Sequence, residues 1–204
     1  MSVDNNHKEL LLKKSKESRA IAHPVELEIL PLRWSPRLGK FGLPSKEDIL
    51  GIVEVARWAP SSYNEQEWRY IVETKDSDGY EELFASLTSS NQEWVKYWPC
   101  LGVLVAKTTF SHNGQPNKSA KFDCGISMGF LLAEATARGI ACHLMAGFAT
   151  EKVKGLYGLT DEFEPVCCFT LGRFIDSSDD VTTRKPVNEV LFFGKTDWLN
   201  RGIK

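Results

Sequence analysis

Ala59-Pro60-Ser61-Ser62-Tyr63-Asn64-Glu65-Gln66-Glu67-Trp68 separates a helical pattern, Glu47 to Trp58, from a strand pattern, Arg69 to Glu73. Pro60 ends the helix because its ring removes a backbone donor and restricts the residue before it. The hydroxyl and carboxamide side chains that follow donate and accept hydrogen bonds without carrying charge. A loop of this composition is suited to holding the edge of a flat heterocycle.

Regular elements extend in both directions from this loop. Before it, Ser45 and Asp48 approximate a capping box for a helix with the apolar face Ile49, Ile52, Val53 and Ala56. After it, the apolar pattern predicts further helices at Tyr80–Leu87, Ser119–Arg138 and, capped by Thr150, up to Leu156. It predicts further strands at Leu101–Ala106, Ile140–Met145 and Val166–Leu171. Strands interleaved with helices indicate a mixed α/β layer architecture.

The chain begins with a polar, lysine-rich lead, residues 1–22, which we expect to be a mobile start leading into a short helix. His23-Pro24 then opens a second helical run, Val25 to Leu30, which Pro31 ends. We predict one domain over residues 23–204, a length that supports a sizeable core.

The helix predicted at Ser119–Arg138 is apolar around most of its circumference. Gly125 and Gly129 are small positions on it, and Gly139 supplies its C-terminal cap. A helix that is apolar on most sides is expected to be buried all round. In a small domain this predicts either a central helix or one that a second subunit covers.

Composition excludes several classes of protein. The net charge of −2 gives no basic excess for binding nucleic acid, and the apolar stretch Cys124 to Ala137 is too short to span a bilayer. The N-terminus has no secretory signal. The 5 cysteines lack metal-ligand spacing, as do the histidines, and we interpret them as buried thiols of a cytoplasmic protein. A redox-sensing role for the adjacent Cys167 and Cys168 stays open.

Arg33-Trp34-Ser35-Pro36-Arg37 places two guanidinium groups and a hydroxyl close together on non-helical backbone. Arginine forks match phosphate oxygens, and the hydroxyl adds a donor. Such a pair of arginines is more often a solvated surface, so this segment alone is a weak signal for phosphate binding.

Several segments together resemble one family. Pro60-Ser61-x-x-Asn64-x-Gln66-x-Trp68 resembles a loop of the nitroreductase family, whose members use flavin mononucleotide (FMN). Arg33-x-Ser35-x-Arg37, the block from Asp123 to Phe148 and Arg184-Lys185-Pro186 resemble further motifs of the same family, and Asn91 with Trp94 fits a weaker one. The resemblance covers residues 24–190 in the family's order, and the ordered set is specific although each motif alone is not.

The resemblance implies an α+β fold with a central, mainly antiparallel sheet flanked by helices. It also implies an intertwined homodimer with FMN at the subunit interface. Arg33, Trp34, Ser35, Arg37 and Arg184 would lie at the phosphate end. The other implied contacts are Asn91 near the pyrimidine edge, the backbone of Leu144, Met145, Ala146 and Gly147 along the ring, and, from the partner subunit, Pro60, Ser61, Ser62, Asn64 and Gln66.

The chain departs from the family's pattern in places that bear on flavin affinity and pocket shape. Glu67 stands where many members have proline, and Ala146 stands where some have glutamate. Leu38 and Phe41 flank the place of a common phenylalanine after Arg37. Near Thr182 a second basic residue is missing, which leaves Arg184 with most of that contact.

The resemblance predicts an NAD(P)H-dependent FMN oxidoreductase. In this interpretation NADH or NADPH gives a hydride to the flavin and leaves, and a nitroaromatic, quinone or related electrophile then accepts the electrons in a ping-pong cycle. No protein residue is required as a catalytic acid or base, and His143 is more often structural in such a context. Two alternatives stay open: a flavin-binding sensor, store or degenerate partner subunit without NAD(P)H turnover, and a structural domain without flavin.

Overall fold

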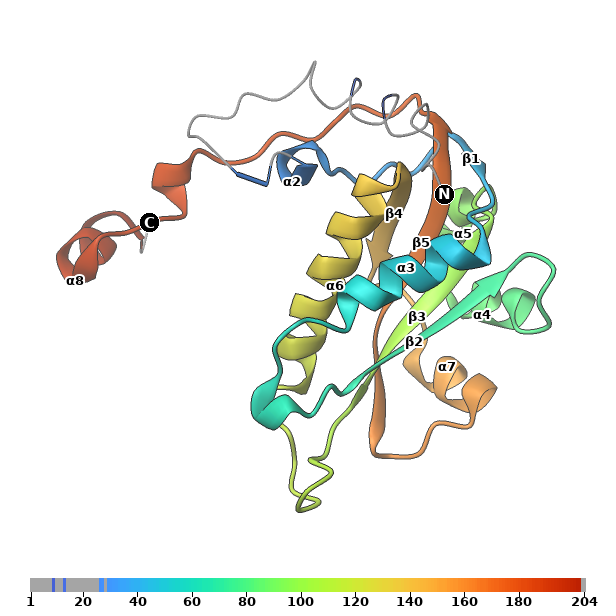
Figure 1. Ribbon diagram of the computed structural model, residues 1–204, viewed down its shortest axis with the longest axis horizontal. Coiled ribbons are helices and arrows are strands. Elements are labelled where there is room, and N and C mark those ends of the chain that lie inside the picture. Colours follow the sequence, from blue (N-terminus) through green and yellow to red (C-terminus); the bar gives the residue numbers. More distant parts are fainter. Residues whose placement is uncertain (1–8, 10–12, 14–25, 28, 203–204) are drawn as a thin grey trace.

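A computed structural model describes residues 9, 13, 26, 27 and 29–202. Its centre is an antiparallel sheet in the order β1-β5-β3-β2, in which β4 pairs with β5 (Figure 1). The strands are β1 (Lys40–Gly42), β2 (Trp68–Thr74), β3 (Cys100–Lys107), β4 (Ile140–Met145) and β5 (Phe163–Asp176). The expectation of a central antiparallel sheet is confirmed.

The longest strand, β5, organises the sheet. Its 14 residues pair with β3 through Phe163–Leu171 and then with β1 through Arg173–Asp176. On its other edge it pairs with β4, from Met145 opposite Cys168 to Ile140 opposite Arg173. The sequence pattern predicted only its apolar middle, because its ends are less buried and more polar.

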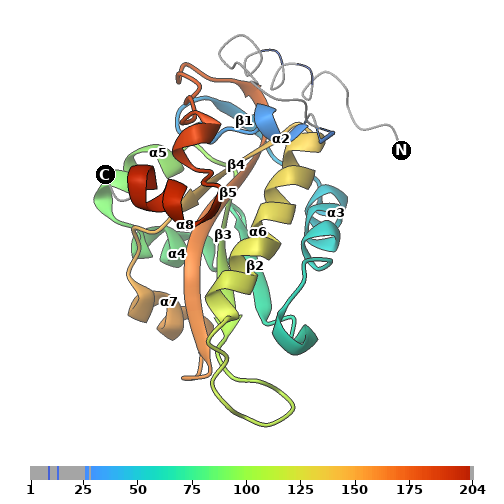
Figure 2. The same ribbon diagram turned by 90° about the vertical axis from the view of Figure 1, so that its left-hand side faces the viewer.

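Helices cover both faces of this sheet (Figures 1 and 2). On one face lie α3 (Lys46–Ala56) and α6 (Ala120–Ala137), and on the other lie α4 (Tyr80–Ser86), α5 (Ser89–Val95) and α7 (Thr150–Tyr157). Successive side chains of a strand point to opposite faces. Residues of β3 accordingly alternate between two apolar cores, Leu101 and Val103 in one, Cys100 and Leu104 in the other. Burial on both faces explains why β3 is a continuous apolar run.

Local signals set the ends of the two helices on the first face. The capping box of α3 is present: Ser45 Oγ accepts from the Asp48 N–H, and the Asp48 carboxylate accepts from the Ser45 N–H. Gly139 follows α6 with φ 68°, which glycine adopts without steric cost. The predicted cap of α7 is wrong by one residue, since Ala149 is the N-cap and Thr150 is the first helical residue.

The segments before and after the sheet differ most from expectation. Helix α2 spans Ile29–Leu32, so Pro31 lies inside it and does not end a run from Val25. Proline is tolerated there because the first turn of a helix leaves its N–H groups unpaired anyway. The predictions for residues 1–22 fall almost wholly outside the described residues, so the proposed division into lead and domain stays a prediction.

Beyond β5 the chain runs past α2 and ends in three short turns away from the sheet (Figure 1). These are Val187–Glu189, α8 (Gly194–Asp197) and a π-helical turn at Trp198–Gly202. Within the described residues, none of the helices has the length and apolar character needed to cross a bilayer.

Candidate functional site

Two arginines far apart in the sequence come together near the start of β4. Arg33 is half-buried, and its Nη1 donates to Ser35 Oγ at 2.9 Å. Burial lowers the pKa of Arg33, and the nearby positive charge of Arg184 lowers it further. Cys142 of β4 also lies close enough to influence it. Two nearby guanidinium charges repel each other, and an anion bound beside them would reduce this repulsion.

The backbone that carries these groups is fixed from several sides. Trp98 Nε1 donates to the Arg37 carbonyl at 3.0 Å, and Ser177 Oγ donates to the Leu38 carbonyl at 2.6 Å. The Asp179 carboxylate accepts the N–H of Leu38 at 2.9 Å and that of Arg37 at a short distance. Arg37 therefore projects from a turn that Trp98, just before β3, and the segment after β5 hold in place.

His143 is a structural part of this region. Its Nδ1 lies 3.0 Å from the Pro36 carbonyl, so Nδ1 carries the proton and donates. Burial lowers its pKa, and the charge of nearby Arg37 contributes in the same direction. Its ring also contacts Trp94, with centroids 4.5 Å apart. The imidazole is therefore neutral at pH 7 and supports the turn, in line with the structural interpretation.

The segment after β4 lies against α5. Asn91 Nδ2 and the Thr88 N–H both donate to the Gly147 carbonyl, at 2.9 and 3.0 Å. A Cβ at Gly147 would stand 2.8 Å from Asn91 Nδ2 and 2.9 Å from Thr88 Oγ1, which requires glycine here. Leu144 and Ala146 are exposed, whereas Met145 is buried. The structure thus brings Asn91 to the predicted ring segment, and Met145 can contribute only its backbone.

Trp34 differs from the other predicted phosphate-end residues. Its side chain is buried in the core, edge-on to Phe174 with ring centroids 6.0 Å apart. Its side chain therefore serves packing, and only its backbone is available for contact with a ligand. Trp98 is also fully buried, and its ring stacks on that of Phe41 with centroids 3.8 Å apart.

The loop before β2 has an unusual backbone. A short 3₁₀ turn spans Ser62–Asn64, and Tyr63, Asn64 and Gln66 have φ values of 54°, 53° and 51°. Asparagine tolerates this left-handed region, but for the other two it costs on the order of 1–3 kcal/mol each. The Asp123 carboxylate holds the loop by accepting the Ser62 N–H at 2.8 Å, and Ser61 Oγ accepts the Gln66 N–H at 3.0 Å.

This loop and the arginines lie at opposite ends of the sheet (Figures 1 and 2). The loop follows α3 at the end where α6 begins, whereas the segment before β1 lies at the end where α6 finishes. One chain therefore gathers Arg33, Ser35, Arg37, Arg184, Asn91 and the residues after β4 into one region. Pro60, Ser61, Ser62, Asn64 and Gln66 do not join that region in the same chain.

In the described part of the chain, we also considered reactive thiols and metal-ligating side chains. The 5 cysteines are free thiols, and burial raises the pKa of Cys168 to about 12 and that of Cys167 to about 11. Such thiols are protonated at pH 7 and weakly reactive, which gives no support to a redox-sensing pair. Within residues 29–202 and the few described before them, no group of three or more metal-ligating side chains occurs.

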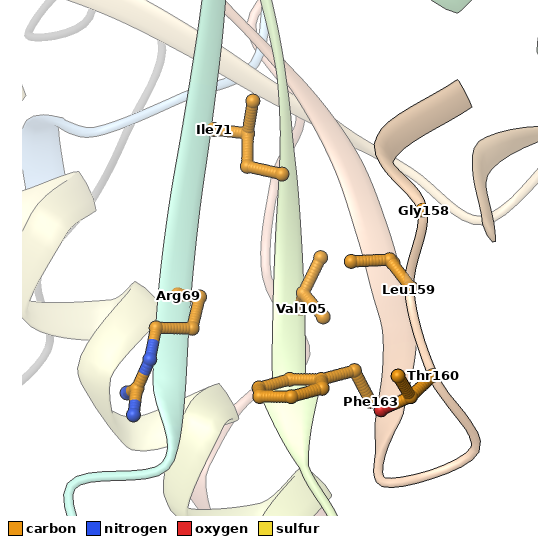
Figure 3. A pocket seen from close by; sticks show the side chains of 7 residues that line it. All are labelled: Arg69, Ile71, Val105, Gly158, Leu159, Thr160 and Phe163. Carbon is orange, nitrogen blue, oxygen red and sulfur yellow. The ribbon is translucent and has the colours of Figure 1, made fainter. Parts of the chain in front are cut away.

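A small hollow of about 300 Å³ opens beside β2, away from these residues (Figure 3). Ile71, Val105 and Phe163 line it, with Arg69 at its rim (Figure 3). Arg69 Nη1 already donates to the carbonyls of Gln66 and Trp68, at 2.9 and 2.8 Å. None of the predicted site residues lines this hollow, and its walls are apolar, so it offers no groups for catalysis.

Comparison with known families identifies the family of this chain. A model of the nitroreductase family matches residues 42–173. The chain belongs to the nitroreductase family. This nitroreductase-family protein is also similar to a crystal structure of an oxidoreductase containing FMN, with 30% identity and a TM-score of 0.78 over 87% of this chain and 95% of the other.

Two more distant structures share the fold. One is described as a nitroreductase in complex with FMN from Exiguobacterium sibiricum, with 21% identity and a TM-score of 0.72 over 86% of this chain and 100% of that one. The other is described as an NAD(P)H:FMN oxidoreductase from Staphylococcus epidermidis, with 18% identity and a TM-score of 0.69 over 86% and 99%. The search among curated proteins gave no match.

Sequence reasoning missed the residues that support the site. Asp179 had no recognisable motif, because a side chain that caps a distant turn leaves no periodic signal. Glu67 was seen only as a departure from the family's proline, although it is fully buried. A charged residue directly before a buried tryptophan was the available hint that it had a partner.

Proposed function

We propose that this protein is an FMN-dependent oxidoreductase that takes reducing equivalents from NADH or NADPH and passes them to a nitroaromatic, quinone or related electrophile. The observation that carries the proposal is that Arg33 donates to Ser35 Oγ and lies within electrostatic reach of Arg184. Two cations and a hydroxyl suit the terminal phosphate of FMN, which carries about two negative charges. Family membership and the FMN-containing relative at 30% identity support the same ligand.

Different residues of the chain would bind the phosphate and the ring of FMN. Arg33, Ser35, Arg37 and Arg184 would hold the phosphate, with Asp179 and Trp98 keeping the turn rigid. The exposed backbone around Ala146 and Gly147 would lie along the ring, and Asn91 would fix that backbone from α5. Bound FMN would supply the hydride and electron transfer, while the protein supplies orientation and charge. The neutral imidazole of His143 supports the turn and takes no catalytic part.

The site would be completed by a second copy of the chain. The Ser61–Gln66 loop lies at the other end of the sheet from the segment before β1, which carries Arg33 and Arg37 (Figure 1). Helix α6 is not buried all round: Phe122 is 72% exposed and Phe130 38%, and a Cβ at Gly125 or Gly129 would meet nothing within 4 Å. The segment after β5 exposes further apolar side chains, among them Val190, Phe193 and Leu199. Exposed apolar area of this extent favours a homodimer.

A direct experiment separates the proposal from its alternatives. The purified protein should absorb as a flavoprotein and release FMN, not FAD, on denaturation. It should then oxidise NADH or NADPH with menadione or a nitroaromatic as acceptor. A yellow protein without this turnover would identify a flavin-binding protein of another kind. A protein that stays colourless with added FMN would refute the flavin site.

A further inference from the structure

A fully buried glutamate lies directly behind the Ser61–Gln66 loop. Glu67 precedes β2 and has no exposed surface. Its Oε1 accepts from Asn117 Nδ2 at 3.0 Å. Its Oε2 is buried too, and the described part of the chain offers it no N–H or hydroxyl donor. An ionised carboxylate in this position would leave a buried charge half satisfied, which is costly.

The Glu67 carboxyl faces a second acid. Asp123, in the first turn of α6, is 5% exposed, and its charge acts on the Glu67 carboxyl. Asp123 Oδ2 accepts the Ser62 N–H at 2.8 Å, an interaction that requires an acceptor oxygen. Two neighbouring carboxyl groups cannot both be ionised without strong repulsion. A proton on Glu67 removes the repulsion and gives the otherwise unpaired Oε2 a partner.

We propose that Glu67 and Asp123 share one proton in the folded protein, with Glu67 Oε2 as donor and Asp123 as acceptor, and that this bond fastens the Ser61–Gln66 loop to α6. Glu67 is then a positioning residue. Its protonated state agrees with the direction of its pKa, which burial raises and the charge of Asp123 raises further.

The strain in the loop explains why such a fastening is needed. Left-handed backbone at Tyr63 and Gln66 persists only where the surroundings determine it. Asp123 holds the start of the loop through the Ser62 N–H, and Glu67 anchors its end through Asn117 and the Lys107 N–H, which donates to the Glu67 carbonyl at 2.9 Å. The shared proton joins these two anchors into one unit.

Other charged groups around the pair do not replace this proton. Arg69 of β2 is the nearby cation, and its Nη1 donates to the carbonyls of Gln66 and Trp68. Lys107 of β3 binds Glu65 and Ser111. Cys124 of α6 is a buried thiol whose pKa is raised to about 12, so it stays neutral. The segment before α6 contributes Asn117, which carries no charge.

The sign of the pH dependence follows from the raised pKa. The folded state binds the Glu67 proton more tightly than the unfolded chain does, so folding stability falls as pH rises from the ordinary glutamate pKa to the raised one. Within that range the pair becomes two anions, and the connection through Glu67 between the loop and α6 is lost, while the Ser62 N–H still donates to Asp123. If the proposed FMN site is correct, flavin retention weakens over the same range because the loop contacts the flavin of the other chain.

The test observes the proton directly. In protein labelled with ¹³C at the glutamate carboxyls, an NMR pH titration should show one glutamate that keeps its proton to higher pH than the others, and this signal should be absent in Glu67→Gln. A wild-type titration in which every glutamate loses its proton in the ordinary range would overturn the proposal. That outcome needs no variant, so a failure of Glu67→Gln to fold does not remove the test.

A second measurement concerns stability and includes a matched control. The glutamine in Glu67→Gln keeps an acceptor for Asn117 and an amide donor for Asp123, so it preserves the connection without titrating. Unfolding free energies from urea titrations at pH 5 to 9 should fall with pH in the wild type and in Glu93→Gln, an exposed control on α5. The slope should be smaller in Glu67→Gln. Equal slopes in all three proteins would contradict the shared proton.

The flavin measurement distinguishes this proposal from the proposed function. Wild-type protein should lose FMN about tenfold more readily at pH 9 than Glu67→Gln does. If neither protein binds FMN at any pH, the proposed function fails. The NMR result then still decides whether Glu67 and Asp123 share a proton. If both bind FMN with the same pH dependence, the link from the shared proton to the loop is wrong.

Discussion

At the scale of single residues, the candidate site combines nearby like charges with the groups that hold them in place. Arg33 is constrained by burial and by Ser35, and Arg184 approaches it from the far end of the chain. Neither arginine alone indicates a phosphate site, since arginines at a surface are common. What indicates a phosphate site is that both arginines lie near one backbone turn, which Asp179, Trp98 and His143 anchor.

Replacing Arg37 with alanine removes a charge-assisted contact worth about 1.5–3 kcal/mol. We expect FMN affinity, measured by fluorescence titration, to fall by about ten- to a hundredfold. Arg57→Ala is the control, because Arg57 is exposed and pairs with Glu54 on α3. Equal losses from both variants would show that the phosphate is held elsewhere.

Asp179 gives a test of the turn itself. In Asp179→Ala the N–H groups of Arg37 and Leu38 lose their acceptor, so the turn that carries the arginines becomes less ordered. We expect FMN affinity to fall by about tenfold, corresponding to about 1.4 kcal/mol. Asp180→Ala, the exposed neighbour, should leave affinity unchanged. An Asp179→Ala protein with wild-type affinity would mean that the other anchors suffice.

At the scale of elements, the sequence predicted what periodicity and capping determine. The bounds of β4 were correct, and those of α6 were within a residue at each end, because Gly139 and a long apolar pattern mark them. The short elements β1 and α5 were missed, because β1 exists through pairing with β5 and α5 has a mostly polar sequence. Pro31 misled the prediction of α2 because proline fits the first turn of a helix.

The candidate site, like the fold, could be predicted from the sequence only in part. The contacts between Asn91 and Gly147 join elements that no local pattern connects, and the resemblance alone suggested that these residues belong together. The separation of the Ser61–Gln66 loop from the arginines could not be read from the order of motifs, because motif order carries no distances. The pairing of β4 with β5 places the residues after β4 in the region of the arginines. The length of α6 separates the Ser61–Gln66 loop from that region.

Glycine substitutions test the junction between β4 and α5. Gly147→Ala would place a methyl group within about 3 Å of Asn91 and Thr88, so it should destabilise the fold by about 1–3 kcal/mol in urea unfolding. Gly155→Ala on α7 meets nothing within 4 Å and should stabilise by about 0.5–1 kcal/mol. Similar effects from both variants would show that the side chains of Asn91 and Thr88 can move aside to accommodate the methyl group.

At the scale of the whole molecule, the residues of the proposed FMN site lie in two groups, one at each end of the sheet. The exposed face of α6 and the apolar segment after β5 are the surfaces that a second chain would cover. A two-fold arrangement of two chains can bring the loop of one to the arginines of the other, and symmetry then produces two equal sites. Binding of FMN and assembly would in this case be linked.

Gly129→Leu tests the link between assembly and flavin. A bulky side chain on the proposed contact face should overpack it, costing about 1–3 kcal/mol of association. Light scattering and flavin absorbance on one sample should show dimer and FMN decreasing together. Gly155→Leu, on an open position of α7, is the control. A monomeric wild-type protein at micromolar concentration that is fully loaded with FMN would contradict the linkage.

The most direct measurement is complementation between two defective chains. Arg33→Ala damages the phosphate end and Asn64→Ala damages the loop, so each protein alone should retain little FMN. After the two are unfolded and refolded together, half of the dimers are mixed, and each mixed dimer has one site with both intact parts. Our account predicts that flavin content recovers to about a quarter of the wild-type sites. No recovery, with mixed dimers demonstrated by mass spectrometry, would show that each site lies within a single chain.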